Sequence, residues 1–397
     1  MCKGFRGTER YFRDVQMLPI PDRILRSTRR VHPEILSGVD CISHLILKLM
    51  IKVKKEGIIL EKTQFEFENE GVLNPGAIKV GDEVHLFYRA VRTGNHSSIG
   101  YCLMDGPLTI SERWEKPILA PELSFESHGI EDARIVKIDD LYYMTYTAFD
   151  GKNARGALAT SKDLRHFEKQ GLLVPPVTYE EFNTLCESAG KVNEKYYHNK
   201  DFYNTNADPN DKIMLWDKNV IFFPRRIKDE LVFLHRIRPG IQIASVKSLQ
   251  DLTMDFWTDY ILHLDEHIIM DPVFEHESSY IGGGCPPIET EHGWLLIYHG
   301  AEEVNNGIVY SACAAALLDI ENPSKVIARL PYALFSPEYI WEKRGDVNNV
   351  VFPTGTALFD DTLYIYYGAA DSRIACASLS FSALLEELIS NTINDEK

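Results

Sequence analysis

Charged and polar side chains interrupt apolar segments of this chain, and several are of types that can transfer a proton or bind an anion. The segment GIEDARIV places Glu131, Asp132 and Arg134 directly before an aromatic segment. A carboxylate and an arginine two residues apart on a strand share one face, where the arginine can keep the carboxylate ionised and oriented. A buried ion pair that only links two parts of the fold explains the same pattern, so both interpretations stay open.

A basic cluster follows, although the protein is acidic overall. The formal net charge of the 397 residues is −16, which argues against nucleic acid or an anionic membrane as the main partner. A solvated basic face is one interpretation of the cluster. Lys218 and Arg236 flank or interrupt apolar strands, however, which favours an anion-binding site. The cluster lies in WDKNVIFFPRRI and FLHRIRPGIQIA and comprises Lys218, Arg225, Arg226, His235, Arg236 and Arg238.

Further polar residues stand in or beside apolar segments elsewhere in the chain. They are Asn74, Arg89, His299, Tyr310 and Asp371. The run Gly282-Gly283-Gly284 is followed neither by Lys-Ser/Thr nor by a helical pattern, so it is not a nucleotide-binding phosphate loop. Its glycines are better suited to a close approach of the backbone to a ligand.

Five aromatic segments of strand length are spread along the chain, each followed by a segment of smaller residues. No helical segment of comparable strength separates these pairs, and repeated strand pairs are typical of a radial β-repeat. We therefore predict an all-β fold, a five-bladed β-propeller with a short C-terminal helix over SALLEELISNTINDEK. Polar strand ends would converge on its axis, where a small polar ligand would bind. The aromatic segments span residues 85–91, 142–149, 231–237, 294–301 and 363–370.

Two regions depart from this repeat. Residues 1–49 are basic and irregular, and we expect an N-terminal extension that need not belong to the functional chain, with residues 50–397 forming the catalytic propeller domain. The apolar run in ISHLILKLMIKV is too short, and too interrupted by lysine, to span a membrane. A longer spacing between the second and third aromatic segments indicates an insertion around residues 190–215, either a solvated loop or a lid.

The seven cysteines are scattered singly, and several lie within apolar strands, among them Cys102, Cys313 and Cys376. This pattern is typical of packed thiols in a reducing compartment, so we expect a cytoplasmic protein. No Cys/His spacing resembles a metal site.

A series of motifs, in order and at similar spacing, resembles glycoside hydrolase family 130. The series runs from LNPGAI, FYRA and GIEDARI through FFPRRI, LHR and IGGGCPPI to VNNVVFPTGTAL and YYGAAD. The chain is similar to the β-mannoside phosphorylases of that family. The resemblance implies a five-bladed β-propeller and inverting phosphorolysis of β-mannosyl oligosaccharides, which gives α-mannose 1-phosphate and a shortened acceptor.

The resemblance also implies a role for individual residues. Asp132 matches the single catalytic acid, which protonates the leaving oxygen by relay through the mannose 3-hydroxyl. Substrate-binding positions are Asn74, Arg89, Arg134, Tyr280 and Asp371; the phosphate-binding positions are Lys218, Arg236, His299 and Tyr310. The family's Asp-Pro-Arg is Asp132-Ala133-Arg134 here, and Tyr280 stands where some members have lysine in the sugar site, so sugar contacts or linkage preference can differ.

Inorganic phosphate is the expected co-substrate, with no cofactor and no metal, and a homo-oligomer is compatible with the family. A phosphorylase needs one acid and fixed cations for phosphate, whereas an inverting hydrolase needs a second carboxylate to activate water. An inverting β-mannosidase, with Glu187 or Glu277 as base, is therefore the alternative. A sugar-binding propeller without turnover is the third possibility.

Overall fold

The computed structural model describes residues 51–197, 212–304, 307–311 and 314–393. The chain divides into two units, Met1–Met50 and Ile51–Lys397, and the described residues all belong to the second. The predicted N-terminal extension lies outside the described residues, as does most of the predicted insertion.

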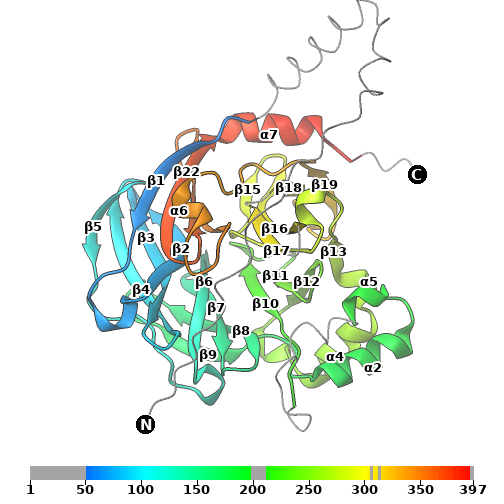
Figure 1. Cartoon of the computed structure of the whole chain (residues 1–397). Coiled ribbons are helices and arrows are strands. Elements are labelled where there is room, and N and C mark those ends of the chain that lie inside the picture. The colour runs from blue at the N-terminus through cyan, green and yellow to red at the C-terminus, as the bar shows by residue number, and fades with distance from the viewer. Residues whose placement is uncertain (1–50, 198–211, 305–306, 312–313, 394–397) are drawn as a thin grey trace, which may run out of the picture. The chain divides into compact units, whose positions relative to one another are not determined.

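The described unit is mostly β, in agreement with the predicted class. Its strands form four sheets (Figure 1). One contains β1 (Lys54–Leu60), β22 (Arg373–Ser380), β21 (Thr362–Ala369) and β20 (Val351–Phe359). A second contains β10 (Lys218–Phe222), β11 (Leu231–Arg236), β12 (Ile241–Val246) and β13 (Ile268–Met270). A third contains β14 (Tyr280–Gly283), β15 (Ile288–Thr290), β16 (Gly293–Val304), β17 (Gly307–Ser311), β18 (Ala315–Leu318) and β19 (Val326–Arg329).

The fourth sheet has eight strands and consists of two antiparallel sets. The first set is β2 (Gly71–Val80), β3 (Glu83–Arg92), β4 (His96–Asp105) and β5 (Thr109–Arg113). The second is β6 (Gly129–Ile138), β7 (Leu141–Phe149), β8 (Ala154–Ser161) and β9 (Glu168–Leu172). A single parallel pair, Ser97 with Gly129, joins them.

All five predicted aromatic segments are strands, namely β3, β7, β11, β16 and β21, which confirms that part of the sequence interpretation. Each pairs with strands on both sides, and β11 is buried along its whole length. Strands that are covered on both faces read as continuous apolar runs, which explains why these segments were recognisable. The thiols of Cys102 and Cys376 are buried as expected, whereas Cys313 lies outside the described residues.

The first and last strands of the described unit meet in one sheet. β1 (blue in Figure 1) pairs with β22 (red), with Lys54 opposite Ser378. The predicted C-terminal helix is present as α7 (Phe381–Ser390), directly after β22. The two ends of this unit are therefore fixed to each other by backbone hydrogen bonds.

The sequence pattern predicted no helix other than the C-terminal one. The structure shows that this was wrong, because helices also lie between the strands. α2 (Tyr179–Ala189) precedes β10, and α4 (Met254–Leu262) with α5 (Leu264–His267) lies between β12 and β13; α6 (Ile340–Lys343) precedes β20. α2 and α4 share an apolar cluster with β11 and β12, which includes Phe182 and Trp257. The signals were local: Thr178 and Glu181 form a capping box, and Gly190 ends α2 with φ of 65°.

Four buried glutamates repeat one arrangement. Each lies in a short helical turn and accepts a hydrogen bond from a tyrosine of an aromatic strand, and each pairs with a lysine or arginine. Both carboxylate oxygens of Glu277, for example, lie 2.7 Å from Arg329 Nη2, and one accepts a bond of 2.8 Å from Tyr298. Because its partners satisfy each oxygen, such a buried carboxylate fixes local structure. The four sets are Glu68–Tyr88–Arg113, Glu126–Tyr146–Lys169, Glu277–Tyr298–Arg329 and Glu342–Tyr367–Lys55.

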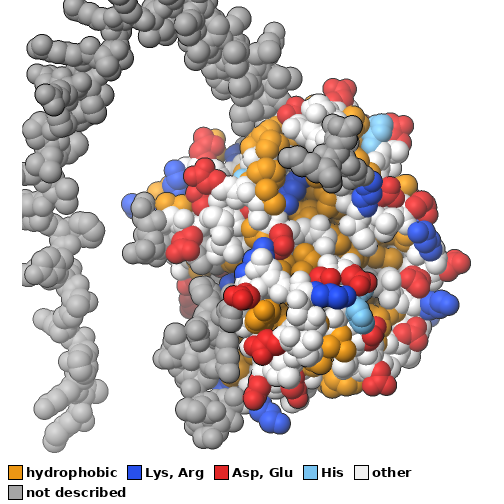
Figure 2. Space-filling model, turned by 90° about the vertical axis from the view of Figure 1, so that its right-hand side faces the viewer, with side chains coloured by type: hydrophobic (Ala, Val, Ile, Leu, Met, Phe, Trp, Pro, Cys, Tyr) orange, Lys and Arg blue, Asp and Glu red, His pale blue; other side chains and the backbone are white. Residues whose placement is uncertain are grey.

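The surface of the described unit is mixed in character. Acidic side chains are scattered among basic and hydrophobic ones on the face shown in Figure 2. Among the described residues, no helix is long and apolar enough to cross a membrane.

Candidate active site

Three polar residues stand at equivalent irregularities of three strands. The register of β2 breaks between Leu73 and Gly76, and β6 and β10 break in the same way. Asn74, Asp132 and Asn219 occupy these breaks with φ of 48°, 54° and 56°. A bulge re-aims its side chain, and asparagine and aspartate tolerate the left-handed conformation better than other non-glycine residues. The simple alternation expected for Asp132 and Arg134 therefore does not apply.

Asn74 binds the side chain of Asp132, and Arg134 binds its main chain. Asn74 Nδ2 donates a hydrogen bond of 2.8 Å to Asp132 Oδ1. Arg134 does not bind this carboxylate directly: its Nη1 donates to the Asp132 main-chain carbonyl at 2.6 Å, and its Nε donates to the Gly284 carbonyl at 2.6 Å. Arg134 thus fixes the bulge, which leaves the carboxylate available to a ligand.

Glu131 connects two cations beside Asp132. Its Oε1 lies 2.9 Å from Arg89 Nη2, and its Oε2 lies 3.6 Å from Lys218 Nζ. Arg89 Nε also donates to Ser97 at 2.8 Å. The structure therefore brings two predicted substrate-contacting cations to the predicted acid through a glutamate for which the sequence indicated no role.

The charges around Asp132 decide its protonation. Burial alone would raise the pKa of this carboxyl, but the positive charges of Arg89, Lys218 and Arg134 and the hydrogen bond from Asn74 lower the pKa overall. The sequence interpretation attributed this effect to Arg134 alone, whereas Arg89 and Lys218 contribute more to the lower pKa of Asp132.

A second cluster contains Arg236, His299 and Tyr280. Arg236 Nη1 lies 3.3 Å from His299 Nε2, and the Tyr280 ring centroid lies 5.0 Å from the Arg236 guanidinium and 3.7 Å from that of Arg238. Burial, followed by the charges of Arg236, Arg134 and Arg238, lowers the pKa of His299 well below its ordinary value. His299 is therefore neutral, and its Nε2 accepts from Arg236.

Strand pairing joins the two clusters. Lys218 at the start of β10 lies opposite Arg236 at the end of β11. Phe352 adds a second link, because its ring lies 4.3 Å from the His299 ring and 5.8 Å from the Arg134 guanidinium carbon. Nothing in the sequence distinguishes Phe352 from the many other aromatic residues of the chain.

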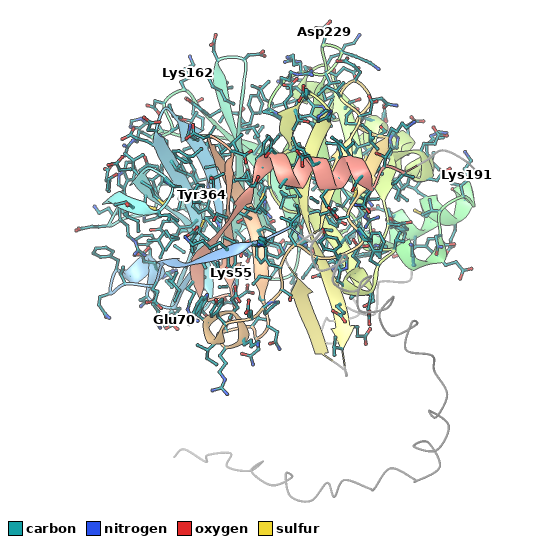
Figure 3. The ribbon with its side chains drawn as sticks, turned by 90° about the horizontal axis from the view of Figure 1, so that it is seen from above. Lys55, Glu70, Lys162, Lys191, Asp229 and Tyr364 are labelled. Atoms are coloured by element: carbon teal, nitrogen blue, oxygen red, sulfur yellow. The ribbon has the colours of Figure 1, made fainter. Side chains whose placement is uncertain are left out.

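Asp371 lies in a pocket of about 340 Å³ together with Arg89, Asp346 and Glu70. Glu70 of this pocket lies on the opposite side of the described unit from Lys162 and Asp229 in Figure 3. Burial, and then the negative charges of Asp132 and Asp346, raise the pKa of Asp371 to about 6, although Arg89 opposes this.

Not every residue of the predicted basic cluster belongs to this site. Arg225 pairs with Glu289 at 2.8 Å and Arg226 with Asp139 at 3.3 Å, and both are partly exposed, so including them in the anion site was wrong. Tyr310 lies in β17 opposite Ala301, and its side chain is not among those that the structure describes. In the part of the chain that the structure describes, no three His, Cys, Asp or Glu side chains are grouped to hold a metal ion.

Comparison with known proteins identifies the family of this chain. The family model of glycoside hydrolase family 130, described as β-1,4-mannooligosaccharide phosphorylase, matches residues 53–389. The chain belongs to this family.

Individual relatives cover nearly the same region. The chain is 36% identical over 344 residues to a 1,2-β-oligomannan phosphorylase of Thermoanaerobacter sp. (strain X514), a match that covers 83% of this chain and 98% of the relative. It is 33% identical to a β-1,2-mannobiose phosphorylase of the same organism, with 83% and 96% covered. Among solved structures, the Listeria innocua β-1,2-mannobiose phosphorylase in complex with β-1,2-mannobiose aligns with a TM-score of 0.62 at 24% identity, over 85% of this chain and 99% of that one. The structural likeness concerns the fold.

Proposed function

We propose that this member of glycoside hydrolase family 130 cleaves β-mannosides with inorganic phosphate and inverts the anomeric carbon, which releases α-mannose 1-phosphate and a shortened acceptor. One observation carries the proposal: the bulge carboxylate Asp132 lies among the cations Arg89, Lys218 and Arg134, and Lys218 stands opposite Arg236 on paired strands. Phosphate is already a nucleophile and needs cations to hold it rather than a basic carboxylate. The names of the two Thermoanaerobacter relatives, both phosphorylases of β-mannosides, agree with it.

We assign the residues as follows. Asp132 donates the proton to the leaving oxygen by relay through a sugar hydroxyl. Phosphate is held by Lys218, Arg236, His299 and Tyr310, and the mannosyl unit by Asn74, Arg89 and Asp371. Arg134 supports the bulge that carries Asp132, and Tyr280 supports Arg236 from within the site. No cofactor takes part in this scheme.

The low pKa of Asp132 is compatible with a role as acid. Without a ligand, Arg89, Lys218 and Arg134 favour its ionised form. Bound phosphate brings nearly two negative charges toward Lys218 and Arg236, which offsets part of that positive charge. Bound phosphate should therefore raise the pKa of Asp132 relative to the ligand-free protein, which favours the protonated form that the acid needs.

The carboxylates proposed as a hydrolytic base are poorly placed. Glu277 is buried and engaged by Arg329 and Tyr298, and Glu187 lies exposed on α2. Neither favours an inverting mannosidase.

A five-bladed β-propeller is the arrangement that we propose for the sheets. The two sets of the eight-stranded sheet count as two blades, because only the pair Ser97–Gly129 joins them. Inner strands of different sheets are linked side by side, as where Thr354 of β20 donates to the Pro75 carbonyl of β2 at 2.9 Å. The pairing of β1 with β22 would close the ring between its first and last blades.

The buried free thiols support a reducing, cytoplasmic location.

Phosphate dependence tests the function directly. Purified protein incubated with β-mannobiose should release α-mannose 1-phosphate when phosphate is present and should be nearly inactive without it. Chromatography of both products measures the result. Free mannose formed at the same rate in phosphate-free buffer would instead identify a mannosidase, and no product under either condition would leave a sugar-binding protein.

The raised pKa of Asp371 predicts a pH dependence of sugar binding. Only the ionised carboxylate accepts hydrogen bonds from sugar hydroxyls with both oxygens, and this form becomes dominant as pH rises through about 6. The affinity for β-mannobiose should therefore be about ten-fold weaker at pH 5 than at pH 7, measured by calorimetry without phosphate.

Two variants check this assignment. Asp371→Asn should remove the pH dependence and bind weakly throughout. Asp346→Asn removes a neighbouring negative charge, so it should keep the dependence but move its midpoint to lower pH. Equal affinity of the wild-type protein at pH 5 and pH 7 would contradict the role of Asp371.

A further inference from the structure

A buried polar set of a different kind from the four glutamate sets described above links the sheet of β10 to β13 with α4. Its members are Asp217, His235 and Tyr260, of which Asp217 and His235 are 0% and 1% exposed. His235 Nδ1 lies 2.7 Å from Asp217 Oδ2, and His235 Nε2 lies 2.7 Å from Tyr260 Oη. A polar network that is buried this deeply lowers the stability of the protein unless each member has a hydrogen-bond partner. Its presence at this position therefore suggests a specific role.

Hydrogen bonds hold the His235 ring at both nitrogens. The Tyr260 hydroxyl, which contacts His235 Nε2, also lies 2.8 Å from the Ile243 carbonyl, so it is itself fixed by the main chain of β12. Tyr260 fixes the imidazole, and the imidazole in turn fixes one oxygen of Asp217.

The other oxygen of Asp217 is directed at the anion site. Asp217 Oδ1 accepts a hydrogen bond of 3.2 Å from the main-chain N–H of Arg236. Asp217 directly precedes Lys218, and His235 directly precedes Arg236, so this contact spans the two strands where Lys218 and Arg236 lie opposite each other. The carboxylate thus connects the backbones of both proposed phosphate-binding cations.

The main chain beyond Arg236 is held in a similar way. Gln242, which is fully buried, accepts from the Ile237 N–H at 2.6 Å and donates to the Ile237 carbonyl at 3.1 Å. Side chains therefore bind consecutive peptide groups next to the arginine. Among the described residues, the glutamate sets of the other sheets include no residue of the two cation clusters, whereas the Asp217 set contacts Arg236 directly.

We propose that Asp217 and His235 are positioning residues that set the spacing of Lys218 and Arg236 for an anion the size of phosphate. Neither touches the anion. This inference rests on the proposed phosphorolysis for the identity of the anion. A displacement of about 1 Å of a binding group can cost as much as a hundred-fold in efficiency, so the contribution of such a support is measurable.

Substitution of Asp217 tests the proposal. Asp217→Ala should raise the KM for phosphate about ten-fold or more while the KM for β-mannobiose changes little. Asp217→Asn keeps an acceptor for the Arg236 N–H and should recover part of the loss. His235→Gln and Tyr260→Phe remove successive outer contacts, so their effects should decrease in that order. These two variants carry the test if Asp217→Ala does not fold.

Tyr146→Phe is the matched control. It removes an equally buried tyrosine hydroxyl from the Glu126 set, which has no contact with Lys218 or Arg236. It should lower the melting temperature without changing the KM for phosphate. Calorimetric titration of each folded variant with inorganic phosphate alone adds a measurement that needs no turnover.

The outcomes separate this inference from the proposed function. A wild-type protein that neither binds phosphate nor requires it would refute the function on which the inference rests. A phosphate-dependent wild type whose Asp217→Ala and His235→Gln variants keep the same phosphate KM, with only lower melting temperatures, would show that the buried set is structural. An equal rise in both KM values would likewise overturn the positioning role.

Discussion

Asp132→Asn should abolish cleavage of β-mannosides while leaving the protein folded. The substitution removes the only proton donor of the proposed scheme, and loss of a general acid typically costs about 10²- to 10⁴-fold in rate. It is sterically conservative: asparagine tolerates the left-handed backbone at this position, where φ is 54°, and its side-chain oxygen can still accept from Asn74. Initial rates with saturating phosphate measure the loss.

Phosphate binding by the same variant provides the control. Removal of a negative charge next to Lys218 and Arg89 leaves the site more positive, so Asp132→Asn should bind phosphate at least as tightly as the wild-type protein does. Inactivity together with retained phosphate binding excludes a collapsed site. Near-normal turnover would remove Asp132 from the mechanism, and lower thermal stability with surviving activity would support the buried structural pair instead.

The strands were predictable because a strand that is buried on both faces appears in the sequence as a continuous apolar run. β11 is buried along its whole length, and so the run LVFLHR was recognisable even though its last two residues are polar. α2 was missed for the opposite reason. Only three of its eleven residues are buried, so its apolar stripe is weak and its capping box was the better signal.

The composition of the site was predictable, but its connections were not. Asp132 and Lys218 could be selected because they interrupt or flank apolar strands. That Glu131 would bridge Lys218 and Arg89 depends on a bulge, which changes the direction of side chains and cannot be inferred from alternation. Arg225 shows the converse error: nearness in sequence to the site did not bring it there, because it pairs with Glu289 at the surface.

Arg236→Ala should raise the phosphate requirement about ten- to a hundred-fold, with the affinity for β-mannoside changed little. Arg236 is buried beside neutral His299 and opposite Lys218, so its guanidinium supplies a full positive charge in a place where water screens it poorly. The loss of one charge-assisted hydrogen bond, about 1.5–3 kcal/mol, gives a weakening of that size. The KM for phosphate at saturating β-mannobiose is the measurement.

Arg225→Ala is the matched control, since it removes an arginine of the same sequence cluster whose partner is Glu289 rather than the site. It should leave both KM values unchanged, because an exposed ion pair contributes little and lies outside the anion site. The opposite result would be full cleavage of β-mannobiose in phosphate-free buffer by both the wild-type protein and the Arg236→Ala variant. It would show that these cations do not bind phosphate for the reaction. Water would then be the nucleophile, and the positive charge around Asp132 would need another explanation.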